Sequence, residues 1–290
     1  MADLNVEYPP EQHFLRDLGI VTEQLSADRS ITVAPVNDPV RNADGAAAIG
    51  FLVTLTDINA ALVALIAGQP DWNATADLSL HTTNPLVGSL AVVDSRLVRA
   101  GSNLVTVATD VYDAGIDADP DAALGQPDRP RTSAATGLVT FARIPRKASV
   151  ASDGFDPATM IGQRRELVPG RPPPAVPVLE RIGLQVVDPE AGVTELTRSE
   201  YVRNSFGAIN GGVLGMVFEG AAEAAVPRHV AADLQIHYLA QAKVGPVRTA
   251  ATVLRRTAGH ALCSVAARDA GHDDLLLALA TVGLIDTSRG

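Results

Sequence analysis

The chain has 290 residues, of which 47% are hydrophobic and 19% charged, the composition of a globular protein long enough for two domains with cores of their own. A formal net charge of −10 argues against a nucleic-acid partner, because a phosphate backbone would repel such a surface. The single cysteine, Cys263, excludes an intramolecular disulfide and fits a reducing compartment, so we expect a cytoplasmic protein.

Membrane targeting finds little support in the sequence. The N-terminus has neither the basic region nor the apolar core of a signal peptide. The one stretch long and apolar enough to span a bilayer is Gly45–Gly68. Asp57 would lie in the middle of that span at a cost of about 2.5–3.5 kcal/mol. We therefore interpret this stretch as a helix buried in a protein core and expect no membrane partner.

Two related stretches organise the chain. Arg41–Leu65 aligns without gaps on the stretch that begins at Arg203, at the constant offset of 162 residues that separates Asn42 from Asn204. Self-similarity at a fixed long offset predicts a duplicated domain. In each copy an apolar helix is predicted, over Ala46–Ala67 and Gly211–Ala225. Both are hydrophobic nearly all round, which predicts helices wrapped by other structure.

The elements around the two helices repeat as well. A short predicted helix ends at Gly19 in the first copy and at Gly183 in the second, and a strand is predicted near Ser30–Ala34. Strands with polar/apolar alternation, separated by turn signals, follow each long helix. The predicted strands are Ala76–His81, Leu90–Val98, Leu104–Tyr112 and Gly137–Ile144 in the first copy, and Ala232–His237, Val247–Leu254, Ala261–Arg268 and Leu275–Ile285 in the second.

The repeat sets the expected domain boundaries. We expect an N-terminal domain over residues 1–146 and a C-terminal domain over residues 178–290. Residues 147–177, rich in proline and glycine, are predicted to be a connector that forms neither a helix nor a central strand. The Asp117–Thr136 segment is predicted to be a surface insertion of the first copy.

A glycine corner opens the second apolar helix and has a carboxylate nearby. Asn210, Gly211 and Gly212 stand where a loop turns into the helix, and Glu219 follows nine residues after Asn210; Asp57 has the matching position in the first copy. Glycines let a ligand approach the backbone, and the N–H groups at a helix start stabilise developing negative charge. The alternative is that the two acids reach solvent or bond to nearby backbone.

The pattern Asn204-x-x-Gly207-x-x-Asn210-Gly211-Gly212 with the acid after it resembles the hotdog-fold acyl-CoA thioesterases of the phenylacetate-degradation (PaaI-like) type. The resemblance implies an α+β double hotdog, two antiparallel sheets of five or six strands, each wrapped round a long central helix. It also implies an active site between the two units, with the glycine corner from one unit and the carboxylate from the other.

Transferred to this chain, the family pattern gives two unequal sites. One combines Asn204, Asn210 and Gly211 of the second copy with Asp57 and Thr75 of the first, and every family position is filled. The other combines Asn42 and the corner Ala48-Ile49-Gly50 with Glu219 and Ala231. This second site lacks the glycine pair and the hydroxyl, so we expect one working site per chain and a degenerate partner in which Glu219 is structural or vestigial.

The function that the resemblance implies is hydrolysis of an acyl-CoA, an activity of lipid metabolism. The Gly211 N–H would bind the thioester carbonyl with help from Asn204, and Thr75 would hold the water. Asp57 would activate that water as a general base or attack directly, and the sequence leaves both routes open. We expect no metal or redox cofactor, coenzyme A entering only as part of the substrate, and a possible homodimer of the two-domain chain. The alternative is a non-catalytic acyl-CoA-binding or regulatory hotdog protein.

Two histidines also repeat, each four residues after an aspartate on the same strand face: His81 after Asp77, and His237 after Asp233. We interpret these as the polar outer face of a sheet in preference to a metal or acid/base pair. A hydratase, the third possibility, is disfavoured because the run Thr83-Asn84-Pro85-Leu86 lacks the aspartate and the histidine that related hydratases carry.

Overall fold

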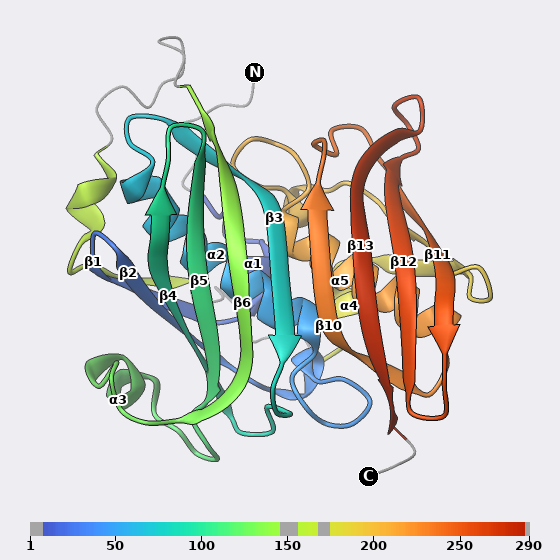
Figure 1. Cartoon of the computed structure of the whole chain (residues 1–290), viewed down its shortest axis with the longest axis horizontal. Helices are drawn as coiled ribbons and strands as arrows, with labels where there is room; N and C mark the ends of the chain where they lie inside the picture. Colours follow the sequence, from blue (N-terminus) through green and yellow to red (C-terminus); the bar gives the residue numbers. More distant parts are fainter. Residues whose placement is uncertain (1–7, 146–155, 168–174, 288–290) are drawn as a thin grey trace.

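The computed structural model, which describes residues 8–145, 156–167 and 175–287, consists of two similar units side by side (Figure 1). Helix α2 (Ile49–Ala67) is the centre of the first unit and α5 (Gly211–Ala225) that of the second. The second helix has the predicted bounds. The first begins three residues later than predicted, because the N–H groups of Ala47 and Ala48 bond to Leu86 and Val40 in extended backbone.

Antiparallel strands surround both helices, and each strand predicted from alternation lies within an observed one. The predicted strand near Ser30–Ala34 is half of a hairpin whose other half was missed. The strands of the first unit are β1 (Ile20–Ser26), β2 (Arg29–Pro35), β3 (Trp72–Thr82), β4 (Leu90–Ala100), β5 (Leu104–Asp113), β6 (Thr132–Ile144) and β7 (Arg164–Leu167). Those of the second are β8 (Leu184–Asp188), β9 (Val193–Leu196), β10 (His229–Tyr238), β11 (Val247–Arg256), β12 (His260–Asp269) and β13 (Leu275–Asp286).

The two predicted sheets are joined edge to edge into one sheet of 13 strands, in the order β7-β1-β2-β4-β5-β6-β3-β10-β13-β12-β11-β9-β8. The joint is the antiparallel pairing of β3 with β10. His81 pairs with Asp233 across it at 3.1 Å, and His237 with Asp77 at 2.5 Å. The repeated histidines thus lie on polar strand positions and bridge the two units. Within the described residues no group of three potential ligands could hold a metal ion.

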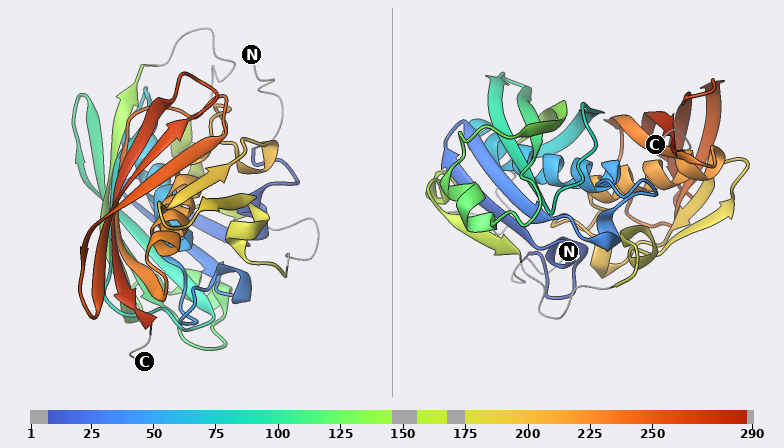
Figure 2. Two further views of the ribbon diagram at one scale, coloured as in Figure 1. Left: turned by 90° about the vertical axis from the view of Figure 1, so that its right-hand side faces the viewer. Right: turned by 90° about the horizontal axis from the view of Figure 1, so that it is seen from below.

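The helices α2 and α5 lie together on one face of the sheet, and the outer strands curl round them (Figure 2). They run antiparallel, since the second residue of each helix lies beside the sixth residue of the other. A Cβ on Gly50 would come within 2.6 Å of the Met216 Cα, and one on Gly212 within 2.8 Å of the Thr54 Cα. Glycine at these two matching positions therefore lets the helix backbones touch. Although α2 is long and apolar enough to cross a bilayer, most of it is buried inside the fold.

Two segments outside the repeat carry structure of their own. In the predicted connector, described only over residues 156–167 and 175–177, β7 pairs with β1 at the edge of the first unit. The predicted surface insertion contains α3 (Pro120–Gly125), which contributes Ala123 and Leu124 to a small second core with residues of β2 and β4. An apolar pair at helical spacing is a weak signal in a loop rich in aspartate and proline.

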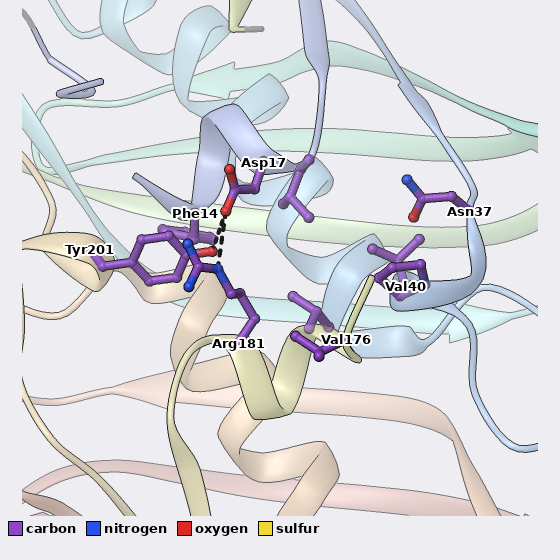
Figure 3. A pocket seen from close by; sticks show the side chains of 10 residues that line it. Phe14, Asp17, Asn37, Val40, Val176, Arg181 and Tyr201 are labelled. Atoms are coloured by element: carbon purple, nitrogen blue, oxygen red, sulfur yellow. Dashed lines mark hydrogen bonds and ion pairs between the residues drawn. The ribbon is translucent and has the colours of Figure 1, made fainter. Parts of the chain in front are cut away.

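The short helices α1 (Phe14–Asp17) and α4 (Val178–Arg181) are present as predicted and meet where the units join. Asp17 pairs with Arg181 at 3.4 Å and accepts a hydrogen bond from the Tyr201 hydroxyl at 2.7 Å, beside a small, mainly apolar pocket (Figure 3). The Arg181 guanidinium also lies 4.8 Å from the centre of the Tyr201 ring. These contacts fasten the second unit to the first on the side of the helices.

Candidate active site

Asp57 is a carboxylate inside an apolar helix, with 9% of its surface exposed. The hydroxyl of Thr75, on β3, donates a hydrogen bond of 2.7 Å to its Oδ1. Burial raises the pKa of Asp57 to about 6, and the hydrogen bond from Thr75 opposes that rise. Asp57 is therefore mostly ionised at neutral pH while being a stronger base than an exposed aspartate.

The glycine corner of the second unit faces this carboxylate across the interface. The point that a Cβ of Gly211 would occupy lies 3.0 Å from Asp57 Oδ2. Gly211 is the first residue of α5, so its N–H has no acceptor within the helix. The structure thus brings together Asp57, Thr75 and Gly211, three residues that the sequence predicted to share a site.

Asn210 caps α5. Its side-chain oxygen accepts a hydrogen bond of 2.9 Å from the Gly212 N–H, and its own N–H donates to the Val202 carbonyl at 2.9 Å. An N-cap asparagine is one of the strongest local signals for a helix start. Its position in the predicted corner agrees with the sequence, and the structure gives it the task of holding the first turn of the helix.

Asn204 lies in the same loop, and its side-chain oxygen bonds within that loop. Its Oδ1 accepts hydrogen bonds of 3.0 Å from the N–H groups of both Phe206 and Ala208. Asn42 does the same in the first unit, with the N–H groups of Asp44 and Ala46. The side-chain oxygens thus hold the loops themselves. The predicted help of Asn204 in orienting a carbonyl would come from its amide nitrogen and stays a prediction.

The matching corner of the first unit is filled by Glu219. Its two carboxylate oxygens accept hydrogen bonds from the N–H groups of Ile49 (3.0 Å) and Gly50 (3.1 Å), at the start of α2. Ala48, which stands where the second unit has Asn210, supplies no side-chain cap. A carboxylate from α5 therefore caps α2.

Glu223, one turn further along α5, adds a second, partly buried acid at the same place. It accepts a hydrogen bond of 3.0 Å from the Ala231 N–H. Burial raises its pKa to about 7. Burial and the neighbouring Glu223 together hold the pKa of Glu219 well above its usual range. At neutral pH the pair therefore shares less than two full negative charges.

Two tyrosines beside Asp57 were not singled out from the sequence. The hydroxyl of Tyr238, the last residue of β10, donates to the Gly211 carbonyl at 3.0 Å. The hydroxyl of Tyr8 donates to the Arg203 carbonyl at 3.3 Å, and its ring lies 5.3 Å from that of His13. Neither belongs to a repeated pattern, so only the fold brings them to the corner.

The side chains that border the two corners also differ. Phe206, which is 53% exposed, meets the ring of Trp72 edge to face at 6.1 Å between ring centres. Trp72 stands three residues before Thr75 on β3. In the first unit, Asp44 has the position of Phe206 and adds to the forces that raise the pKa of Glu223. The corner near Asp57 thus has an aromatic border, and the one near Glu219 an acidic border.

The arrangement of a curved antiparallel sheet on a central helix, present twice, is the double hotdog fold. A conserved hotdog protein of unknown function from Alicyclobacillus acidocaldarius superposes with a TM-score of 0.59 at 12% identity, over 94% of this chain and 98% of its own. The tesB protein of Mycobacterium avium subsp. paratuberculosis gives 0.57 at 9% identity, over 91% and 95%. An acyl-ACP thioesterase from Bacteroides thetaiotaomicron gives 0.54 at 10% identity, over 88% and 97%. These likenesses establish the fold.

A match to a protein family indicates the class of reaction. Residues 202–283 match the acyl-CoA thioesterase N-terminal domain family. The match begins just before the Asn210 corner and covers α5 and most of the strands that follow it. It supports the predicted class of enzyme, a thioester hydrolase. No curated protein matches the sequence.

Proposed function

We propose that the protein is an acyl-CoA thioesterase with one working site per chain, formed by Asp57 and Thr75 of the first unit and the Asn210–Gly211 corner of the second. The observation that carries the proposal is the approach of the Asp57 carboxylate, hydrogen-bonded to Thr75, to the backbone at the start of α5. A buried base next to a free helix N–H is what hydrolysis of a carbonyl compound requires.

The Gly211 N–H is the oxyanion donor in this proposal. It binds the thioester oxygen as negative charge develops there, and the dipole of α5 adds to the stabilisation. In one route Asp57 takes a proton from a water as the water oxygen attacks the carbonyl carbon. In the other the carboxylate itself attacks, coenzyme A leaves as the thiolate, and water then hydrolyses the anhydride. Both routes end in a free acid and coenzyme A.

Thr75 keeps the carboxylate in place for either route. Its hydroxyl holds Oδ1, which leaves Oδ2, the oxygen that faces Gly211, for the reaction. A hydroxyl bound to one oxygen also fixes the plane of the carboxylate, since the side chain then cannot rotate freely. The predicted contact of Thr75 with the water becomes, in this proposal, an indirect one through Asp57.

The second corner carries no activity in this proposal. The donors at the start of α2 are occupied by Glu219, at the place where an oxyanion would bind. Asp44 adds negative charge beside the partly ionised pair of Glu219 and Glu223, which repels the phosphates of coenzyme A. This corner thus has neither unoccupied N–H donors at the helix start nor a carboxylate that a substrate can reach.

Coenzyme A is the carrier that we favour, in keeping with the description of the matching family. The net charge of −10 disfavours an acidic carrier protein as the partner. The resemblance to the phenylacetate type proposes aryl acyl groups as candidates beside aliphatic ones. We also keep the proposals of a cytoplasmic location and a role in lipid metabolism.

Release of free thiol from short, medium, long and aryl acyl-CoAs tests the proposal. Wild type is compared with Asp57→Ala and Glu219→Ala. Turnover that is lost only in Asp57→Ala supports a single site at Asp57. Loss only in Glu219→Ala would move the active site to the other corner. Absence of turnover together with a rise in Tm on adding acyl-CoA would identify a binding protein instead.

A further inference from the structure

The corner that carries the oxyanion donor contains two consecutive glycines, the residue type with the greatest backbone freedom. Asn210 is followed by Gly211 and Gly212, and glycine weakens a helix more than any residue but proline. Neither glycine can take a side chain without a close contact. A Cβ on Gly211 would crowd Asp57, and a Cβ on Gly212 would collide with Thr54. A contact from outside the helix can therefore add to the cap of Asn210 in fixing the direction of the Gly211 N–H.

Tyr238 makes that contact from the end of β10. Its hydroxyl donates to the Gly211 carbonyl at 3.0 Å. A Cβ on Gly211 would lie 3.6 Å from two carbons of the Tyr238 ring. The same Cβ would lie 3.0 Å from Asp57 Oδ2. The phenol and the carboxylate thus border one small space beside the first residue of α5. Burial, with the charges of Asp57 and Asp77, holds the pKa of Tyr238 well above its usual range, so the phenol stays a donor.

The other corner has no such residue. Asp77 of β3 matches Asp233 of β10 in the repeat, so the position of Tyr238 falls on Thr82 in the first unit. The start of α2 is held instead by the carboxylate of Glu219. A side chain that stabilises the helix start by occupying its N–H groups would prevent them from binding an oxyanion. One that bonds to the carbonyl leaves the N–H group open.

We propose that Tyr238 is a positioning residue of the thioesterase site: its hydroxyl holds the carbonyl of Gly211, which restrains the backbone of that residue and leaves its N–H open, and its ring keeps water from one side of Asp57. The inference rests on the proposed function and adds to it a residue that the sequence pattern did not contain. Tyr238 itself transfers no proton and forms no bond with the substrate.

Tyr238→Phe tests the hydroxyl and Tyr238→Ala the ring. In the first variant we expect kcat to fall about tenfold with KM within twofold of wild type, because only the donor in the transition state is displaced. The acid limb of its pH profile should be unchanged. In Tyr238→Ala water reaches Asp57, the pKa of the carboxylate falls, and the acid limb moves to lower pH.

Tyr201→Phe is the matched control, because it also removes the hydroxyl of a partly buried tyrosine, whose acceptor, Asp17 at 2.7 Å, lies in α1 and not in the corner. We expect its kcat to equal that of wild type even if its Tm falls. Equal kcat in Tyr238→Phe and Tyr201→Phe would overturn the proposal.

Hydrogen–deuterium exchange of the peptide that covers residues 206–215 gives a measurement independent of turnover. Faster exchange in Tyr238→Phe than in wild type and Tyr201→Phe is expected if the phenol fixes the corner. Unchanged exchange would overturn the inference whether or not the protein hydrolyses thioesters, and absence of wild-type turnover with faster exchange would overturn the proposed function alone.

Discussion

The starts of α2 and α5 have nearly the same backbone, and the side chains around them make them chemically different. Asp57 stops short of the opposite helix and bonds to Thr75, whereas Glu219, one methylene longer, reaches the N–H groups of Ile49 and Gly50. Asn210 caps its own helix, and Ala48 cannot. The comparison teaches that the N–H groups at such a helix start either stay available to bind a negative charge or are already occupied by a carboxylate. Which of the two holds depends on the length of the acid on the opposite helix.

Removal of the Asp57 charge gives the largest effect that we expect. Asp57→Asn should lower kcat/KM by about 10²–10⁴-fold, the usual contribution of a general base. It should also make the protein more stable above pH 7, by about 1–3 kcal/mol, because the folded-state pKa of about 6 lies above the unfolded value and the ionised carboxylate is then a cost. Thermal unfolding between pH 5 and 8 checks this.

The gain in stability of Asp57→Asn over wild type should shrink as the pH falls through 6, since wild-type Asp57 then becomes neutral as well. A variant that is less stable than wild type at pH 8 would contradict this account of the buried charge.

Substitutions at the two glycines of the corner should separate catalysis from folding. In Gly211→Ala the methyl group enters the space between Asp57 and Tyr238, so we expect kcat to fall at least tenfold with little change in Tm. In Gly212→Ala the methyl group meets the α2 backbone at Thr54, so we expect a loss of about 1–3 kcal/mol of stability from overpacking. Urea unfolding and thiol release measured on both variants test the contrast, which fails if Gly211→Ala keeps full activity.

Thr75→Ala makes the working corner more like the degenerate one, which has Ala231 at that position. Without the hydrogen bond that favours the ionised form, the pKa of Asp57 should rise further. The acid limb of the kcat/KM profile should therefore move to higher pH, and activity at pH 7 should fall several-fold. Thr54→Ala, whose hydroxyl bonds only to the Gly50 carbonyl in the same helix, is the control. An unshifted profile in Thr75→Ala would show that another group sets the acid limb.

Glu219→Ala should affect stability and not turnover. It leaves the N–H groups of Ile49 and Gly50 without their acceptor, at about 1–3 kcal/mol. Part of this cost is offset, because a buried acid next to Glu223 is also removed. Denaturant unfolding measures the net effect. A large loss of thiol release in a folded Glu219→Ala protein would contradict the assignment of the working site to Asp57.

Much of this organisation could be predicted because its signals are local or periodic. The constant offset between Asn42 and Asn204 predicted two units, and the glycine corner at Asn210 predicted the start of α5 to the residue. Alternation predicted eight strands, but β1, β7, β8 and β9 were missed. In β1 the pattern is broken by Thr22 and Gln24, both of which are buried.

The parts that could not be predicted depend on which distant residues meet. Tyr238 and Tyr8 reach the corner only because β10 ends there and residues 8–13 lie beside the Arg203 carbonyl. The cap that Glu219 provides to α2 depends on the antiparallel contact of the two helices, which no local pattern encodes. The edge-to-edge joint of β3 and β10 likewise follows from which strands remain at the sheet edges once each unit has folded.

Because both units belong to one chain, a substitution can change one corner without changing the other. Two identical subunits paired through such an edge would carry every substitution twice, so a change that fills one corner would fill both. Because the two units here lie in one chain, Glu219 can occupy one helix start while Asp57 keeps the other open. An open helix start is then needed at only one corner, and the other corner, closed by Glu219, serves as a joint between the two helices.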